Sequence, residues 1–228
     1  MTAKTVGVIG GMGPAATVEF LSRLVRATPA ARDEDHLHVL VDCDPAIPSR
    51  TAAILEGGPS PAPRLCMIAR GLERAGAQLL AMPCNTAHAY LDAIRAAVDI
   101  PVLDMVSEAA ARAVVGPVGL LATEAAVRSG LYEKAFHERG IRILSPGAED
   151  QEEVTRLIAA VKAGDRLEAL RPRLQLVVSR LAREGARAVV IGCTEVSLLH
   201  DAGSSLPGID ALDCLVEATV REARREER

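Results

Sequence analysis

The sequence predicts an α/β protein built from two pseudo-symmetric, doubly wound (Rossmann-like) domains with parallel sheets. Short apolar runs rich in Val, Ile and Leu alternate with longer segments rich in Ala, Leu and Arg. The short runs do not alternate polar with apolar residues, as a strand with one solvated face would. Strands that are apolar throughout and separated by helical segments are typical of a parallel sheet covered on both faces. An internal repeat is the second observation that predicts this fold.

The predicted elements follow one another closely along the chain. Strands are expected where the short runs are dominated by β-branched and aliphatic residues, at residues 5–9, 39–42, 79–82, 102–103, 118–121, 141–144 and 188–191. The first helix is expected to begin at Pro14, because proline suits the first turn of a helix. Together with that helix, at residues 14–27, the Ala/Leu/Arg segments predict helices at residues 62–75, 87–98, 106–114, 126–139, 151–163, 167–184 and 212–226.

The repeat joins two segments that each end in a cysteine motif. Residues 72–86 read LERAGAQLLAMPCNT, and residues 181–195 read LAREGARAVVIGCTE. Five of these fifteen positions are identical without gaps, among them Cys84 and Cys193, which lie 109 residues apart. Further pairs in the same order are Val6-Gly7 with Val118-Gly119 and Pro101/Asp104 with Pro207/Asp210. These matches indicate two homologous halves.

Each half is expected to form one domain. The first covers residues 1–105, the second covers residues 106–209, and the last helix, within residues 210–228, is expected to pack back on the first domain. Ligands of open α/β sheets bind beyond the carboxyl ends of the strands, and each repeated cysteine follows a predicted strand. We therefore expect a cleft between the domains in which Cys84 and Cys193 face one point from opposite sides.

Two opposed thiols suit proton transfer at a stereocentre. Inverting a carbon that carries hydrogen needs a base on one face and an acid on the other. Cysteine can serve as either, because its pKa of ~8.5 lies close to working pH. A buried Cys is more commonly a small core residue, which is the interpretation we give to Cys43, Cys66 and Cys214, since these lack a repeated partner.

Four motifs resemble the aspartate racemase branch of the aspartate/glutamate racemase family. They are PCNTAH (83–88), IGCTE (191–195), GVIGGMGP (7–14) and IPSRTAAIL (47–55), and the resemblance runs from the first strand to the last helix. It implies a two-base racemase that interconverts L- and D-aspartate, needs neither pyridoxal nor a metal, and commonly forms a homodimer.

The resemblance also implies roles for individual residues. The catalytic thiols are Cys84 and Cys193; the α-carboxylate is held by Asn85, Thr86, Thr123 and Thr194; Met12 lines the cleft; and Arg50 and Lys162 bind the side-chain carboxylate of the substrate. Arg offers a bidentate fork to such a group and Lys a point charge. Two positions depart from the aspartate pattern, since Ser49 replaces an acidic residue and Ile158 replaces a Tyr. Glutamate, or a broader range of amino acids, therefore stays open as the substrate.

Composition excludes several other classes of protein. Only 2% of residues are aromatic, with no Trp, and the net charge is −4, so we expect no nucleic-acid partner. No apolar run approaches the length of a membrane span. The opening MTAKTVGVIGG lacks the basic and long apolar regions of a signal peptide, and five cysteines without such a signal are expected to be thiols. We expect a cytoplasmic enzyme that acts on a small molecule.

Competing interpretations have weaker support. A nucleotide-dependent oxidoreductase is one alternative, because the segment Gly11-Met12-Gly13-Pro14-Ala15-Ala16 fits a dinucleotide-binding G-x-G-x-x-A. Asp42, however, follows Gly13 at a longer distance than that fingerprint expects. A metal hydrolase using Cys84 and His88 lacks a third ligand at a matching spacing, even with His36 and His38 nearby in sequence. Pyridoxal bound to Lys162 would leave both thiols unexplained. A sensor of acidic amino acids, or a sister decarboxylase or isomerase of small carboxylic acids, would keep the fold and change the chemistry.

Overall fold

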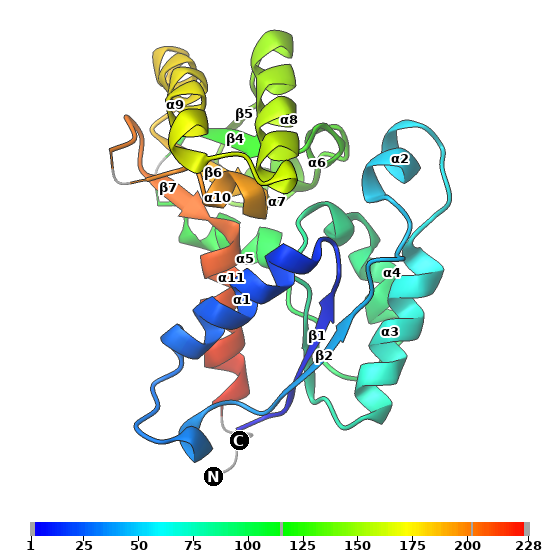
Figure 1. Ribbon diagram of the computed structural model, residues 1–228. Coiled ribbons are helices and arrows are strands. Elements are labelled where there is room, and N and C mark those ends of the chain that lie inside the picture. The colour runs from blue at the N-terminus through cyan, green and yellow to red at the C-terminus, as the bar shows by residue number, and fades with distance from the viewer. Residues whose placement is uncertain (1–2, 115, 202, 226–228) are drawn as a thin grey trace. The chain divides into compact units, whose positions relative to one another are not determined.

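The computed structural model describes residues 3–114, 116–201 and 203–225. These residues form two compact units (Figure 1). Unit 1 comprises the described parts of residues 1–105 and 212–228, and unit 2 comprises those of residues 106–211. Both units consist of parallel strands connected through helices, which confirms the predicted α/β class.

Unit 1 has a three-stranded parallel sheet in the order β2-β1-β3. The strands are β1 (Val6–Gly10), β2 (Val39–Cys43) and β3 (Leu79–Ala81). A parallel bridge between Leu80 and Val102 continues the sheet beyond β3. The helices are α1 (Pro14–Ala27), η1 (Asp33–Asp35), α2 (Arg50–Leu55), α3 (Ala62–Arg74), η2 (Thr86–Tyr90), α4 (Leu91–Arg95) and, near the end of the chain, α11 (Ala211–Ala223).

The helix α11 is tied to the first segments of the chain within unit 1. The backbone N–H of Lys4 donates to the Ala223 carbonyl at 2.8 Å. Arg23 of α1 forms an ion pair with Asp213 at 2.8 Å. The buried side of α11 is mainly apolar, as expected for a helix that packs against the rest of its unit.

Unit 2 has a four-stranded parallel sheet in the order β5-β4-β6-β7. The strands are β4 (Val118–Ala122), β5 (Ile143–Leu144), β6 (Ala188–Gly192) and β7 (Gly208–Asp210). The helices are α5 (Met105–Arg112), which begins at the last residue of the first segment of unit 1, α6 (Glu124–Arg128), α7 (Leu131–His137), α8 (Ala148–Ala163), α9 (Leu167–Arg183) and α10 (Thr194–Ser197).

The strands β2-β1-β3 of unit 1 and β5-β4-β6 of unit 2 share one order and one register, which is the structural basis of the sequence repeat. In unit 1, Val6 pairs with Leu79. In unit 2, the matching residues of the repeat, Val118 and Ala188, pair in the same way. The segments that end in the two cysteine motifs therefore form equivalent strands, β3 and β6.

The repeated Val-Gly pair has a packing reason. A Cβ placed on Gly7 would lie 3.2 Å from Cβ of Leu72 and 2.6 Å from Cδ2 of Leu80. A Cβ placed on Gly119 would lie 2.9 Å from Cδ1 of Leu181, which is the repeat partner of Leu72. In each unit the same helix leucine thus packs directly on the strand glycine, and only glycine leaves room for it.

Several predicted elements differ from the observed ones. The helix expected at 126–139 is two helices, α6 and α7, because Gly130 has a φ of 68° and interrupts the helical hydrogen bonds. The helix expected at 87–98 is the 3₁₀ helix η2 followed by the short α4. The strand expected at 102–103 is only the bridge at Val102, whereas β7, α2 and α10 were not predicted. Residue 226, at the end of the last predicted helix, lies outside the described residues.

Each unit has its own aliphatic core. In unit 1 the core lies between the sheet and helices such as α3, and it includes Ile9, Leu65 and Leu80. In unit 2 it lies between β4 and β6 on one side and α8 and α9 on the other, and it includes Leu121, Leu174 and Val189. Among the described residues, no helix is both long and apolar enough to cross a membrane.

Candidate active site

Cys84 lies in the loop that leaves β3 at its carboxyl end. Its backbone N–H donates to the Met82 carbonyl at 2.8 Å, which turns the chain sharply after the strand. The thiol is free, 8% of the residue surface is exposed, and the side chain packs in the core cluster that also contains Met12 and Ile47. Asn85 and Thr86 follow it and are also buried. A buried thiol at a strand end is therefore followed directly by two buried polar residues.

His88 holds this loop from within the protein. Its Nε2 accepts the backbone N–H of Met105 at 3.2 Å, and its Nδ1 lies 2.9 Å from the Cys84 carbonyl oxygen. Because a carbonyl can only accept, Nδ1 carries the proton, and the ring is the neutral tautomer. Burial lowers the pKa of His88, which favours this neutral form. Both ring nitrogens are occupied, so His88 does not offer a lone pair to a metal beside Cys84.

The glycine loop after β1 brings Met12 to Arg50. Gly11 has a φ of 91°, and a Cβ there would overlap the backbone of Asp44, so glycine is required. Arg50 Nη2 donates to the Met12 carbonyl at 3.3 Å, and Nη1 donates to the carbonyls of Ile47 and Pro48. Ser49 caps α2 and so fixes where Arg50 begins the helix, accepting the Ala52 N–H at 3.2 Å.

The Arg50 guanidinium can donate a further hydrogen bond to a ligand. Its Nε is buried and has no hydrogen-bond partner in the described part of the chain. Its hydrogen-bond partners are backbone carbonyls, and within the described residues no carboxylate lies at ion-pair distance from it. A half-buried cation of this kind is able to receive an anionic group of a ligand.

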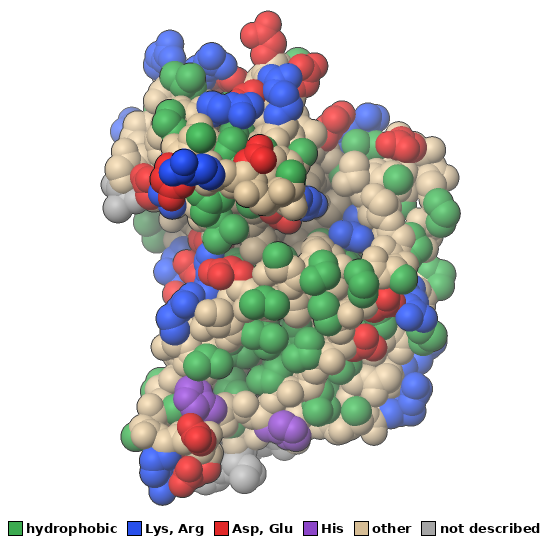
Figure 2. Space-filling view, viewed as in Figure 1, with side chains coloured by type: hydrophobic (Ala, Val, Ile, Leu, Met, Phe, Trp, Pro, Cys, Tyr) green, Lys and Arg blue, Asp and Glu red, His purple; other side chains and the backbone are tan. Residues whose placement is uncertain are grey.

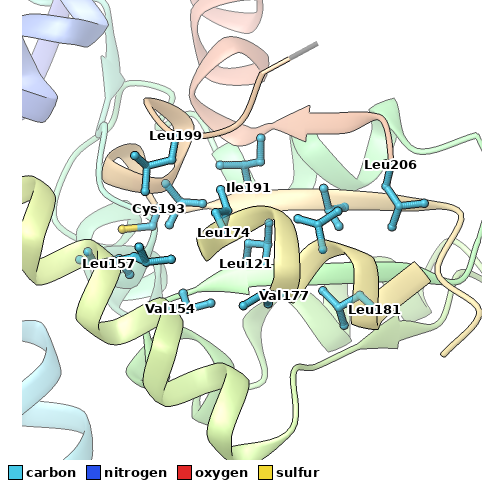
Figure 3. Close-up of a cluster of buried hydrophobic side chains, with 14 of the residues drawn as sticks. Leu121, Val154, Leu157, Leu174, Val177, Leu181, Ile191, Cys193, Leu199 and Leu206 are labelled. Carbon is cyan, nitrogen blue, oxygen red and sulfur yellow. The ribbon is translucent and has the colours of Figure 1, made fainter. Parts of the chain in front are cut away.

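In unit 2, Cys193 occupies the position equivalent to Cys84. It follows β6 and serves as the N-cap residue of α10. The register pairs Ala122 with Gly192, so Thr123 and Cys193 leave adjacent strands side by side. Cys193 is free and 7% exposed, and it lies at the edge of the apolar cluster beside Leu157 of α8 (Figure 3). Thr194, the next residue, is a buried polar side chain like Asn85 and Thr86.

Two charged groups stand beside Cys193. Its Sγ donates to Glu195 Oε2 at 2.9 Å, and the other oxygen, Oε1, lies 3.8 Å from Lys162 Nζ. Burial raises the pKa of the Cys193 thiol well above its ordinary value, and the Glu195 carboxylate raises it further. Lys162 opposes this effect through its positive charge. The thiol form of Cys193 is therefore favoured.

The predicted site residues fall into two groups, one in each unit. Unit 1 brings together Met12, Arg50, Cys84, Asn85 and Thr86, and unit 2 brings together Thr123, Lys162, Cys193 and Thr194. Of the eight buried polar residues among those described, four lie in the two cysteine loops. Buried polar groups are costly unless they bond to a partner or a ligand, so these loops are candidate binding sites.

Comparison with known proteins gives the family. A model of the Asp/Glu/Hydantoin racemase family matches residues 9–219. The chain belongs to this family. It is therefore an amino-acid racemase, and so an isomerase, which replaces the oxidoreductase and hydrolase interpretations of the sequence.

Relatives of this racemase carry several substrate names. The aspartate racemase of Picrophilus torridus is 31% identical, with a TM-score of 0.87, and the match covers 99% of this chain and 96% of that one. The broad specificity amino-acid racemase RacX of Bacillus subtilis is 27% identical over 236 residues, 94% of this chain and 96% of the relative. The glutamate racemase of Desulforudis audaxviator is 31% identical over 163 residues, 65% of this chain and 56% of that protein.

Three residues near the racemase motifs had no role assigned from sequence. Glu195 was visible only as the last letter of the GCTE motif, and His88 only as a potential metal ligand. Gln151, at the start of α8, donates from Nε2 to the Ala122 carbonyl at 3.1 Å, beside Thr123. Its other side-chain atom, Oε1, is buried without a partner in the described residues. No sequence pattern indicates this contact, because Gln151 lies 29 residues after Ala122.

Proposed function

We propose that this racemase interconverts L- and D-aspartate without a cofactor, using Cys84 and Cys193 as base and acid on opposite faces of the α-carbon. One observation carries the proposal: both free, buried thiols follow equivalent strands, β3 and β6, in the same register of two like sheets. Structural cysteines have no reason to recur at this position in both halves, whereas a two-base reaction needs one group from each.

The two cysteine side chains carry one proton between them before and after the proposed reaction. A thiolate on one face removes the α-proton and becomes a thiol, and the electron pair left on the α-carbon is delocalised into the carboxylate. The thiol on the other face then gives its proton to the α-carbon and becomes the thiolate. Asn85, Thr86, Thr123 and Thr194 are proposed to hold the α-carboxylate, because side-chain hydroxyl and amide donors at the strand ends suit an anion.

Aspartate specificity is proposed from two cations. Arg50 has an unpartnered, buried Nε, and Lys162 is 54% exposed at its side chain, with Glu195 as a distant ion partner. Both are proposed to bind the distal carboxylate of the substrate. The named activity of the Picrophilus relative supports aspartate, and the whole-length similarity to RacX supports a broader range of amino acids as the second candidate.

We also propose a cytoplasmic homodimer. Cys84 and Cys193 are free thiols, and the proposed mechanism needs them reduced, a state that the cytoplasm maintains. Unit 1 exposes Val18 and Val25 of α1 and Val41 of β2, and hydrophobic side chains gather over these elements (Figure 2). An exposed apolar area of this kind is suited to contact with a second copy of the chain. Light scattering coupled to gel filtration tests the dimer, and a monomer at every concentration would refute it.

The test of function is proton exchange at the α-carbon. Reduced, EDTA-treated protein is incubated in D₂O with L-aspartate and separately with D-aspartate, with no pyridoxal or nucleotide added. Loss of the α-proton signal in NMR, with the other enantiomer appearing on chiral chromatography, is the expected result. A panel with glutamate, alanine and serine defines the range. If no amino acid loses its α-proton, the proposed racemisation is wrong.

A further inference from the structure

The two cysteine loops differ in one charge. When the repeat is aligned, Cys84 matches Cys193 and Thr86 matches Glu195. Thus the thiol of unit 2 has a carboxylate two residues after it where the thiol of unit 1 has a neutral hydroxyl. The strands, the register and the cysteine positions are shared, so this difference is a property of the side chains and not of the fold.

The carboxylate is in direct contact with the sulfur. Cys193 Sγ lies 2.9 Å from Glu195 Oε2, and the thiol is the only one of the two groups that has a proton to donate. The Glu195 side chain is only 15% exposed, so water screens its charge poorly. A thiolate at this position would place two negative charges at hydrogen-bond distance in a buried setting. The carboxylate therefore favours the thiol.

The other charged groups around Cys193 do not compensate Glu195. The acidic residues on the buried side of α8, Asp150 and Glu153, are paired with Arg180 and Arg173 of α9. At the end of β7, Asp210 accepts a hydrogen bond from Ser197 of α10. On α6, Glu124 is paired with Arg128 at 3.9 Å. Lys162 is the cation on the Glu195 carboxylate, at 3.8 Å and 54% exposed, so its compensation is partial.

We propose that Glu195 is a positioning residue that holds Cys193 in the thiol form, so that the resting racemase is asymmetric, with Cys193 as the acid and Cys84 as the thiol that supplies the base. The inference rests on the proposed two-thiol function and adds an ordered resting state to it. Cys193 gives its proton to the α-carbon in one direction. The thiolate that remains beside Glu195 has a high proton affinity, so it recovers a proton readily in the reverse direction.

Lys162 takes a second role in this arrangement. By pairing with Oε1 of Glu195, it lowers the negative potential at the sulfur, which the direction of its effect on the pKa of Cys193 also indicates. Removing Lys162 should therefore strengthen the hold of Glu195 on the thiol proton. The charge-neutral variant Glu195→Gln and the variant Lys162→Met should move the reactivity of Cys193 in opposite directions.

The experiment measures thiol reactivity and not turnover. Reduced protein without substrate is alkylated with iodoacetamide over a range of pH, and the rate at Cys193 is read from its own peptide by mass spectrometry. Only the thiolate reacts, so the midpoint of the rate against pH reports protonation, and the plateau at high pH reports access to the reagent. The Cys84 peptide is the internal reference in the same sample.

Glu195→Gln is expected to move the Cys193 midpoint to lower pH, and the alkylation rate near neutral pH should rise about tenfold for every pH unit by which the midpoint falls. Lys162→Met is expected to lower that rate. Glu195→Asp keeps the negative charge, so it should hold the Cys193 midpoint above that of Glu195→Gln, as the wild-type residue does. The exposed control Glu124→Gln should leave the alkylation of both peptides unchanged. The titration can be repeated without any reagent from the ultraviolet absorbance of the thiolate. The absorbance of the Cys193→Ser variant is subtracted from that of the wild type, which leaves the signal of Cys193.

An unchanged Cys193 midpoint in Glu195→Gln would overturn the proposal, and so would a change confined to the plateau, which a merely structural role would give. The result does not depend on catalysis. If the midpoint moves but aspartate does not lose its α-proton, the charge effect stands and the proposed racemisation of aspartate fails. If aspartate loses its α-proton but the Cys193 midpoint does not move, the proposed racemisation stands and the proposed role of Glu195 fails.

Discussion

The His88 side chain holds the backbone of Cys84, with Nδ1 2.9 Å from the Cys84 carbonyl oxygen, while its other nitrogen accepts from the Met105 N–H. The contact joins a loop that carries a proposed catalytic thiol to the start of α5. A protonated ring would lose the Met105 contact, because Nε2 would then carry a proton. The loop is therefore anchored by an imidazole that must stay neutral.

Acid should weaken the fold through this group. Burial lowers the folded-state pKa of His88 below its usual 6.5, so the unfolded chain takes up the proton first as the pH falls. The contribution of the neutral His88 ring to the free energy of unfolding is complete above about pH 6.5 and is lost progressively below it. Urea unfolding at neutral and mildly acidic pH should show this loss, and His88→Asn, which keeps a donor near Nδ1, should show a smaller one. Equal pH dependence in both proteins would contradict the role of His88.

The glycines under the helix leucines should tolerate no side chain. Gly7→Ala places a Cβ 2.6 Å from Leu80 Cδ2 and 2.9 Å from Ala77 Cβ, and should lower the free energy of unfolding by roughly 1–3 kcal/mol. Gly71→Ala, inside α3 with nothing within 4 Å of the new Cβ, is the matched control and should raise it by about 0.5–1 kcal/mol. Denaturant titration of both variants tests the pair, and a stable Gly7→Ala would refute the packing argument.

Two leucines on different faces of α9 should differ sharply in their effect on stability. Leu174 is fully buried in the core of unit 2, whereas Leu176 is 58% exposed. Leu174→Ala should cost about 2–5 kcal/mol of unfolding free energy through lost burial and a cavity. Leu176→Ala should change it by less than about 0.5 kcal/mol. Thermal and urea unfolding measure both, and similar costs would mean that α9 packs with another face.

Loss of either proposed catalytic thiol should stop racemisation. Cys84→Ala and Cys193→Ala should each lower kcat by about 10²–10⁴-fold or more, because a general acid or base is removed. The control Cys66→Ala removes a half-exposed thiol that donates to the Ala93 carbonyl, and it should keep normal turnover. Wild-type turnover in either active-loop variant would rule out the two-base scheme.

The proposed side-chain cations should discriminate between substrates. Arg50→Ala should raise KM for aspartate much more than for alanine, which has no distal carboxylate to lose a partner. Arg50→Lys should not restore aspartate binding fully, because a lysine cannot span the carbonyls of Met12, Ile47 and Pro48 with a planar fork. Steady-state kinetics with both amino acids measure this. Equal effects on the two substrates would show that Arg50 does not contact the distal carboxylate.

The α/β class and the equivalence of β3 and β6 follow from the amino-acid sequence alone. Continuous apolar runs and an aligned repeat can be read directly from the chain, and they do not depend on the details of tertiary packing. The repeat also placed Cys84 and Cys193 after equivalent strands, because a residue that follows a strand stays at its carboxyl end. The break at Gly130 escaped prediction, since the surrounding residues are all compatible with one continuous helix.

Which charged groups meet the thiols depends instead on tertiary packing. Lys162 and Glu195 are 33 positions apart in the sequence, and their 3.8 Å contact depends on how α8 packs against α10. Gln151 reaches Ala122 for the same kind of reason. Hydrophobic pattern fixes the face that a helix buries, but the position of one polar atom depends on the packing of several elements at once. For that reason the sequence indicated both thiols, and the structure supplied the electrostatic partners of Cys193.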